Sequence, residues 1–246
     1  MRENELALLI GKGIYFVKAG DRKINTEFGI VDQSELLKKK FGDKIKTHSG
    51  EEFTIVKPNL IDILMKKMKR LPQIIMPKDA SLILGYTGVS TDSFIVDAGT
   101  GSGFLSIFLG YYCNKGKVVT YEKRSEFAKV ARDNIDTIGL KNVIVKERDI
   151  LNGIEEKNVD LITLDIEFPE QVVGICFNSL KKGGWLVIYS PHIEQVIRTR
   201  KEVEKLSFSQ VKTIENITRE WRVGKHTLPE VSGVIHTGWL TFARNF

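Results

Sequence analysis

The most informative segment of the chain is FIVDAGTGSGF, residues 94–104, in which an apolar run ends in Asp97 and glycines follow at 99, 101 and 103. Glycines at this spacing after a strand let the backbone turn tightly and approach a bound ligand. The GxGxxG fingerprint of dinucleotide-binding proteins would need glycine at position 104, where this chain has Phe104. A carboxylate at Asp97 would repel a pyrophosphate, whereas it would attract a ligand with an ammonium and a sulfonium. The pattern therefore favours S-adenosylmethionine over NAD.

Three further carboxylates stand at the ends of predicted strands. Glu122 follows the glycine loop by about twenty residues, where a carboxylate can accept both hydroxyls of an adenosine ribose. Asp149, in the segment KERDI, is placed to accept a hydrogen bond from the adenine amino group of the same ligand. Asp165 ends the fourth strand, in LDIEFPE, and is expected to face the transferred group, because ligands of open α/β sheets bind outside the carboxyl ends of the strands.

The elements that must position these carboxylates alternate along the chain from residue 94. Strands are predicted at 94–98, 118–121, 143–145, 161–164 and 185–190, and helices from 104, over 125–138, near 170–180 and at about 194–206. This alternation indicates an α/β fold, with a doubly wound, mainly parallel, Rossmann-like sheet. A turn is expected at residues 182–184. Two last strand-like segments, 210–221 and 236–244, are expected to form a hairpin at the sheet edge.

The amino-terminal residues have a different character, since short β-like runs alternate there with turn signals such as Ser49-Gly50. We expect a small β-rich domain over 1–58, a connecting helix over 59–71 and a catalytic domain over 72–246. Residues 1–71 hold 15 Lys and Arg against 10 Asp and Glu, which is +5 of the total charge of +6. This excess indicates a polyanionic partner such as nucleic acid. The candidate contacts are Lys66, Lys67, Lys69 and Arg70.

The composition of the 246-residue chain, 42% hydrophobic and 28% charged, is that of an ordinary globular protein. Cys113 and Cys176 lie far apart without metal-ligand or CxxC spacing, so we expect buried thiols and no metal. No apolar run is long enough to cross a membrane, and the start MRENELALLIGKG lacks the basic region of a signal peptide. These features predict a cytoplasmic protein without a membrane partner.

The sequence resembles the class I S-adenosylmethionine-dependent methyltransferases, and among them the tRNA (adenine-N1)-methyltransferases of the bacterial and archaeal TrmI type. The resemblance rests on PQIIMPKD (72–79), VDAGTGSGFLS (96–106) and HTGWLTFAR (236–244). Residues Arg219, Trp221 and Val223 are similar to the strand that precedes the last of these segments.

The chain also departs from the family pattern at three positions. The fourth motif usually reads Asp-x-Pro-x-Pro-Trp, whereas here Glu167 replaces the first proline and Glu170 the tryptophan. The segment before the glycine loop usually has tyrosine where this chain has Met76. These changes bear on the contact with the target base.

The resemblance implies methyl transfer from S-adenosylmethionine to N1 of adenosine in tRNA, at T-loop position 58 and also at 57, by a homotetramer. Methyl transfer to N1 produces a cation, which a carboxylate at Asp165 would stabilise. Gln73 and His236 are candidates for contacts with the target base. The expected cofactor contacts are Asp97, Gly99, Thr100, Gly101, Ser102, Gly103, Phe104, Glu122, Lys123, Asp149, Ile150 and Asp165.

Two alternatives stay open on the sequence alone. The first is a methyltransferase for a protein, such as the isoaspartate repair class, or for a small molecule; the basic amino-terminal domain argues against it. The second is a non-catalytic subunit of a tRNA methyltransferase. The presence of Asp97, Glu122, Asp149 and Asp165 together argues against this second alternative.

Overall fold

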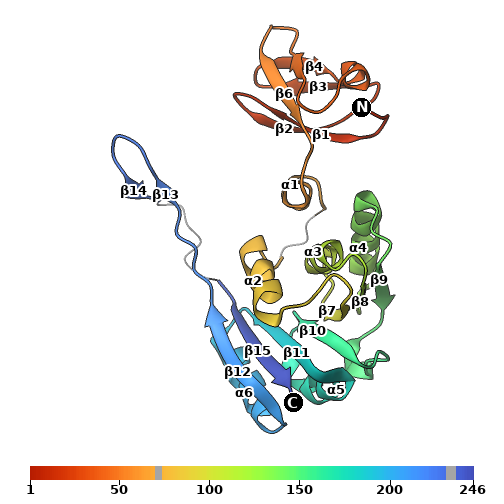
Figure 1. Cartoon of the computed structure of the whole chain (residues 1–246), viewed down its shortest axis with the longest axis vertical. Coiled ribbons are helices and arrows are strands. Elements are labelled where there is room, and N and C mark those ends of the chain that lie inside the picture. The colour runs from red at the N-terminus through yellow and green to blue at the C-terminus, as the bar shows by residue number, and fades with distance from the viewer. Residues whose placement is uncertain (70–73, 231–236) are drawn as a thin grey trace. The chain divides into compact units, whose positions relative to one another are not determined.

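The computed structural model describes residues 1–69, 74–230 and 237–246 (Figure 1). The chain divides into two compact units, Met1–Met68 and Lys69–Phe246. Helix α1 (Leu60–Lys66) lies at the end of the first unit and begins with a capping box between Asn59 and Asp62. It is shorter than the predicted helix, because the N–H groups of both Lys67 and Met68 bond to the Ile63 carbonyl and close the last turn.

The first unit is the β-rich domain that the turn signals predicted. Its antiparallel sheet has the order β2-β1-β6-β5, formed by Ile14–Lys18, Leu6–Ile10, Glu52–Val56 and Lys44–Lys46. A hairpin of β3 (Lys23–Thr26) and β4 (Gly29–Asp32) is followed by a 3₁₀ helix, η1 (Gln33–Lys38). Buried apolar side chains such as Leu9, Leu36 and Phe53 form its core.

The second unit contains a seven-stranded sheet of order β12-β15-β11-β10-β7-β8-β9. The parallel strands are β7 (Phe94–Ala98), β8 (Lys117–Glu122), β9 (Val143–Glu147), β10 (Val159–Leu164) and β11 (Leu180–Ser190). The antiparallel strands β15 (Trp239–Asn245) and β12 (Phe208–Glu215) complete one edge. The predicted α/β fold with an edge hairpin is therefore confirmed.

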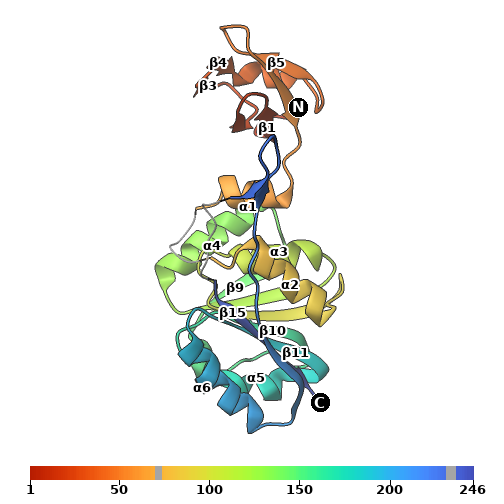
Figure 2. The ribbon, with the colours of Figure 1, turned by 90° about the vertical axis from the view of Figure 1, so that its left-hand side faces the viewer.

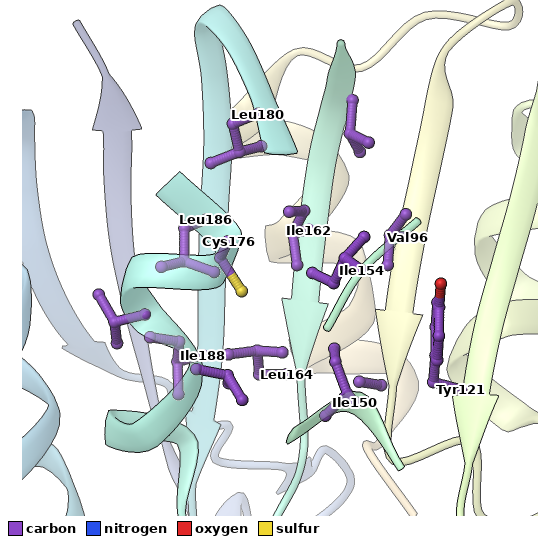
Figure 3. Packing of buried hydrophobic residues seen from close by; sticks show 14 of the residues in the cluster. Val96, Tyr121, Ile150, Ile154, Ile162, Leu164, Cys176, Leu180, Leu186 and Ile188 are labelled. Carbon is purple, nitrogen blue, oxygen red and sulfur yellow. The ribbon is translucent and has the colours of Figure 1, made fainter. Parts of the chain in front are cut away.

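Helices cover both faces of this sheet (Figure 2). Helices α2 (Pro77–Thr87), α3 (Phe104–Tyr112) and α4 (Ser125–Ile138) lie on one face. Helices α5 (Val173–Ser179) and α6 (Ile193–Glu204) lie on the other. Figure 3 shows part of the core, in which Cys176 of α5 faces Leu186 and Ile162 of the sheet. Both cysteines are buried free thiols, as predicted.

Three segments of the second unit also differ from the prediction. Pro169 begins a separate 3₁₀ helix, η3 (Pro169–Val172), so α5 is shorter than the predicted helix 170–180. The expected turn at 182–184 lies inside β11, where the pairing with β10 shifts between Val159 and Leu161. The predicted strand 210–221 ends at Glu215, because Glu215 pairs with the first residue of β15.

Beyond Glu215 the chain forms a short hairpin of β13 (Trp221–Arg222) and β14 (Leu228–Pro229), which extends away from the main sheet (Figure 1). Trp221 and Val223 of this hairpin are exposed apolar residues, as is Ile217 in the segment before it. Among the residues that the structure describes, no helix is long and apolar enough to cross a bilayer.

Candidate active site

The glycine loop lies between β7 and α3 and touches the end of β10. An ideal Cβ built on Gly99 would lie 1.9 Å from the carbonyl oxygen of Asp165, and Gly99 has a φ of +85°. No side chain fits at that position. Gly103 also has a positive φ, and a Cβ there would lie 3.3 Å from the Cβ of Ala131. The glycines therefore let the loop pack directly on β10 and α4.

Asp97 is 2% exposed, and its carboxylate accepts three hydrogen bonds from hydroxyl groups. Ser106 and Thr120 donate to Oδ2, both over 2.7 Å, and Thr163 donates to Oδ1 over 2.6 Å. Burial raises the pKa of the Asp97 carboxyl. The charge argument from the sequence took the Asp97 carboxylate to face the ligand directly, whereas this carboxylate faces inward and joins β7 to α3, β8 and β10.

Glu122 is 3% exposed at the carboxyl end of β8. Its Oε2 accepts a hydrogen bond from the Gly101 N–H over 2.9 Å, and its Oε1 accepts one from the Arg124 N–H over 3.0 Å. The Arg124 Nε also donates to Oε1 over 3.4 Å, whereas Oε2 can accept a second hydrogen bond. Glu122 therefore fixes the glycine loop and retains acceptor capacity for a ligand.

A cavity of about 670 Å³ opens at the carboxyl ends of the parallel strands. Its walls include six of the residues that the sequence predicted: Gly99, Glu122, Lys123, Asp149, Ile150 and Asp165. A smaller pocket shares Gly99 and Asp165 with this cavity, and its wall also contains the predicted residues Asp97, Thr100, Gly101, Ser102 and Phe104. Gly103 lies in neither wall.

Asp149 and Ile150 come from the segment after β9. The Oδ1 atom of Asp149 accepts a hydrogen bond from the Leu151 N–H over 3.0 Å and caps the 3₁₀ helix η2 (Ile150–Asn152). Ile150 is buried and contributes an apolar surface to the cavity. Together they offer a carboxylate oxygen and an apolar side chain to a flat ring.

Asp165 follows β10 and lines both the large cavity and the smaller pocket. Its N–H donates to the carbonyl of Ala98 over 2.8 Å, which fixes the backbone beside the glycine loop. Within residues 1–69, 74–230 and 237–246, nothing donates a hydrogen bond to its carboxylate. Burial, and secondarily the charge of Asp97, raise the pKa of Asp165 to about 7. A cation beside this carboxyl group would favour its ionised form.

The cavity also has a wall that the sequence interpretation missed. It includes Phe168 after β10, Pro191 and His192 after β11, and Gln195 and Arg198 of α6. The strand-end rule could have identified the residues after β11. It could not have identified the α6 residues, because helix periodicity does not show which turn of a helix lines a cavity.

The residues proposed to contact RNA are distributed over several parts of the chain. Lys66 and Lys67 are exposed in the first unit, whereas Lys69 belongs to the second, where its N–H and carbonyl bond to the Asn134 side chain. Arg70, Gln73 and His236 lie outside the described residues.

Two of the segments that carried the family resemblance meet in the second unit. The Lys78 ammonium donates to both carboxylate oxygens of Asp79, to the Asn216 carbonyl and to the Thr237 hydroxyl, over 2.7–2.9 Å. Asp79 is buried. The start of α2 is thereby joined to the residue after β12 and to the segment before β15. Two segments of the family resemblance that are far apart in sequence are therefore in contact.

A sequence model of the family described as "tRNA methyltransferase complex GCD14 subunit" matches residues 57–235. The chain belongs to this family. The archaeal relative named tRNA (adenine(57)-N(1)/adenine(58)-N(1))-methyltransferase TrmI, from Methanocaldococcus jannaschii, is 37% identical over 94% of this chain and 90% of its own length. The Thermus thermophilus protein named tRNA (adenine(58)-N(1))-methyltransferase TrmI is 31% identical over 89% of this chain and 87% of its own length.

Solved structures of this family's fold superpose on the whole chain. The Thermotoga maritima protein described as a SAM-dependent O-methyltransferase has a TM-score of 0.92 and 35% identity, and the match covers 100% of this chain and 94% of that one. The Aquifex aeolicus tRNA (m1A58) methyltransferase TrmI has a TM-score of 0.87 and 26% identity, over 100% and 98% of the two chains. Among the described residues, no cluster of three His, Cys, Asp or Glu could hold a metal ion.

Proposed function

We propose that this chain transfers a methyl group from S-adenosylmethionine to N1 of adenosine in tRNA, at T-loop position 58 and also at position 57. The observation that carries the proposal is the position of Asp165, which lines both the large cavity and the smaller pocket. Among the described residues, nothing donates a hydrogen bond to its carboxylate. The names of the archaeal and bacterial relatives support the substrate.

The residues that line the cavity and the smaller pocket offer a partner to each part of S-adenosylmethionine. We assign the ribose hydroxyls to Glu122, the adenine to Asp149 and Ile150, and the methionine part to the loop from Gly99 to Phe104. The glycine loop allows the backbone to approach because a Cβ at Gly99 would collide with Asp165. When bound, S-adenosylmethionine supplies a methyl group on a positively charged sulfur.

Asp165 acts on the target base in this proposal. Adenine N1 carries an in-plane lone pair, so the base needs positioning and no prior loss of a proton. The methylated ring is cationic, and the ionised Asp165 carboxylate stabilises the charge that develops on it. It also accepts a hydrogen bond from the exocyclic amino group. An adenine inside a folded T-loop must first leave its stack, at a cost of a few kcal/mol.

The direct test uses unmodified tRNA and labelled S-adenosylmethionine, followed by nucleoside analysis. We expect 1-methyladenosine from the parent protein, and a single-turnover rate roughly 100-fold lower for Asp165→Asn. Label in any other nucleoside, or in protein, would contradict the proposal. The name of the Thermotoga relative makes methylation of oxygen the second reaction to assay.

We also propose that the basic amino-terminal part binds the tRNA phosphates. Exchange of Lys66, Lys67, Lys69 and Arg70 for glutamine should weaken tRNA binding and flatten its salt dependence, by up to about 0.7 to 0.9 in slope for each lost phosphate contact. The affinity for S-adenosylmethionine should stay at the parental value. Unchanged tRNA affinity and salt slope would show that the RNA binds elsewhere.

The assembly that we propose is a homotetramer. The family resemblance suggests it, and the exposed apolar side chains of the β13–β14 hairpin are suited to an interface between copies. Light scattering of the purified protein should give four times the mass of the chain, and Val223→Lys should lower that mass. A monomer at micromolar concentration would contradict this assignment.

A further inference from the structure

Phe168 is an exposed aromatic side chain in the wall of the cavity, three residues after Asp165. It is 43% exposed, although its neighbour Pro169 is buried. An exposed aromatic ring on a convex surface needs no explanation. A ring in a concave wall beside the proposed catalytic carboxylate offers a flat apolar face to whatever enters the cavity.

The loop that carries Phe168 is fixed on its amino-terminal side by Gln195, which is 5% exposed. The side-chain amide of Gln195 donates hydrogen bonds to the carbonyls of Ile166 and Glu167, each over 2.9 Å. Both partners can only accept, so the amide orientation is determined by the chemistry. The backbone immediately before Phe168 is therefore anchored to α6.

The carboxyl-terminal side of the same loop is anchored to α6 as well. Arg198 donates from its Nε to the Oε1 of Glu170 over 2.8 Å. Two polar links from one helix thus hold the backbone on both sides of Phe168. A loop held in this way loses little backbone freedom when a ligand stacks on the ring that it carries.

The position of Phe168 in the sheet order separates it from the assigned cofactor contacts. The residues assigned to the cofactor follow β7, β8 and β9, whereas Phe168, Pro191 and His192 follow β10 and β11. Asp165 follows β10 and stands between these two groups, because β10 pairs with β7 on one side and β11 on the other. A base that presents its edge to Asp165 from the β11 side would pass over Phe168.

We propose that Phe168 is the stacking platform for an adenine ring in the cavity, and that this ring is the target base. The assignment rests on the proposed function. Stacking of a base on an aromatic side chain contributes about 1–3 kcal/mol by alanine substitution. The cofactor also contains an adenine, so the experiment must distinguish these two sources of the same ring.

The test compares Phe168→Leu, which keeps apolar volume and removes the ring, with Phe168→Tyr, which keeps the ring. Tyr111→Leu is the matched control, because Tyr111 is also exposed and aromatic but belongs to α3 outside the large cavity and the smaller pocket. Each variant is assayed for kcat/KM with tRNA and for S-adenosylmethionine affinity by calorimetry. The fluorescence of tRNA carrying 2-aminopurine at position 58 is recorded in parallel.

We expect Phe168→Leu to lower kcat/KM for tRNA by about 5- to 150-fold, the equivalent of lost base stacking. The parent should quench the fluorescence of 2-aminopurine, and this quenching should be absent in Phe168→Leu. Phe168→Tyr and Tyr111→Leu should keep both properties, and S-adenosylmethionine affinity should stay parental in all variants. Parental kcat/KM in Phe168→Leu would overturn the proposal, as would a loss confined to S-adenosylmethionine affinity, which would assign the ring to the cofactor adenine.

These readouts separate the two proposals. If the parent produced no 1-methyladenosine, the proposed function would fail. Ring-dependent quenching of 2-aminopurine would in that case still show that Phe168 stacks a tRNA base, whereas quenching that persists in Phe168→Leu would overturn the platform itself.

Discussion

Neutralising Asp165 should make the protein more stable at alkaline pH while it lowers the rate of methyl transfer. The pKa of this carboxyl is raised from 3.8 to about 7 in the folded protein. Between these two values the folded protein holds a proton that the unfolded chain has released, so stability falls as the pH rises through this range. Asp165→Asn has no such proton and does not lose this stability.

The size of the stability difference follows from the pKa shift of Asp165. One pKa unit corresponds to about 1.36 kcal/mol, so the full shift would correspond to roughly 4 kcal/mol. Asp165 is half-buried and lines an open cavity, where water screens its charge, so the expected effect is smaller, about 1–2 kcal/mol. Asp165→Asn should therefore match the parent near pH 4 and exceed its stability by about 1–2 kcal/mol near pH 8.

Denaturant unfolding followed by tryptophan fluorescence measures this difference. Trp185, Trp221 and Trp239 all belong to the second unit, so the signal reports on the unit that contains the cavity. Glu167→Gln is the matched control, because Glu167 is an exposed carboxylate in the same wall. A stability difference between Asp165→Asn and the parent that is the same near pH 4 and near pH 8 would refute the reasoning.

Three other substitutions test the rest of the site. Glu122→Gln should weaken S-adenosylmethionine binding by about 1.5–3 kcal/mol in calorimetry, the range for hydrogen bonds to a charged group, and parental affinity would remove Glu122 from the site. Gly99→Ala should destabilise the second unit by more than about 2 kcal/mol in denaturant unfolding, because its Cβ meets a backbone carbonyl; a smaller loss would show that the loop can move away from β10. Lys78→Met should cost about 2–4 kcal/mol by leaving the buried Asp79 carboxylate without its cation, and the additional change Asp79→Asn should recover part of this loss.

The sequence was sufficient for features that depend on local pattern. The helix predicted over 125–138 has these bounds in the structure, since its apolar residues recur at helical spacing and Gly139 ends it in a left-handed conformation. Glu122 and Asp165 could be placed because parallel strands bring their carboxyl ends to one edge of the sheet. The family-level segments identified the methyltransferase fold.

Other features depend on contacts that no local pattern records. The three hydroxyls on Asp97 come from α3, β8 and β10, so only the assembled sheet shows that this carboxylate faces inward. Gln195 and Arg198 fit the pattern of an ordinary amphipathic helix. They line the cavity only because α6 packs beside η3. Gly183 and Gly184 predicted a turn from the sequence alone, but they lie within β11. The irregular pairing there depends on the neighbouring strand β10.

The position of β15 within the sheet imposes an order on folding. This strand is the last in sequence, yet it lies between β11 and β12, so β12 cannot join the sheet before β15 has docked. Until that step, the apolar β11 exposes an unpaired edge, which is a site for pairing with other chains. We expect refolding to show a late phase in the fluorescence of Trp239, and aggregation during refolding to decrease when this phase is complete.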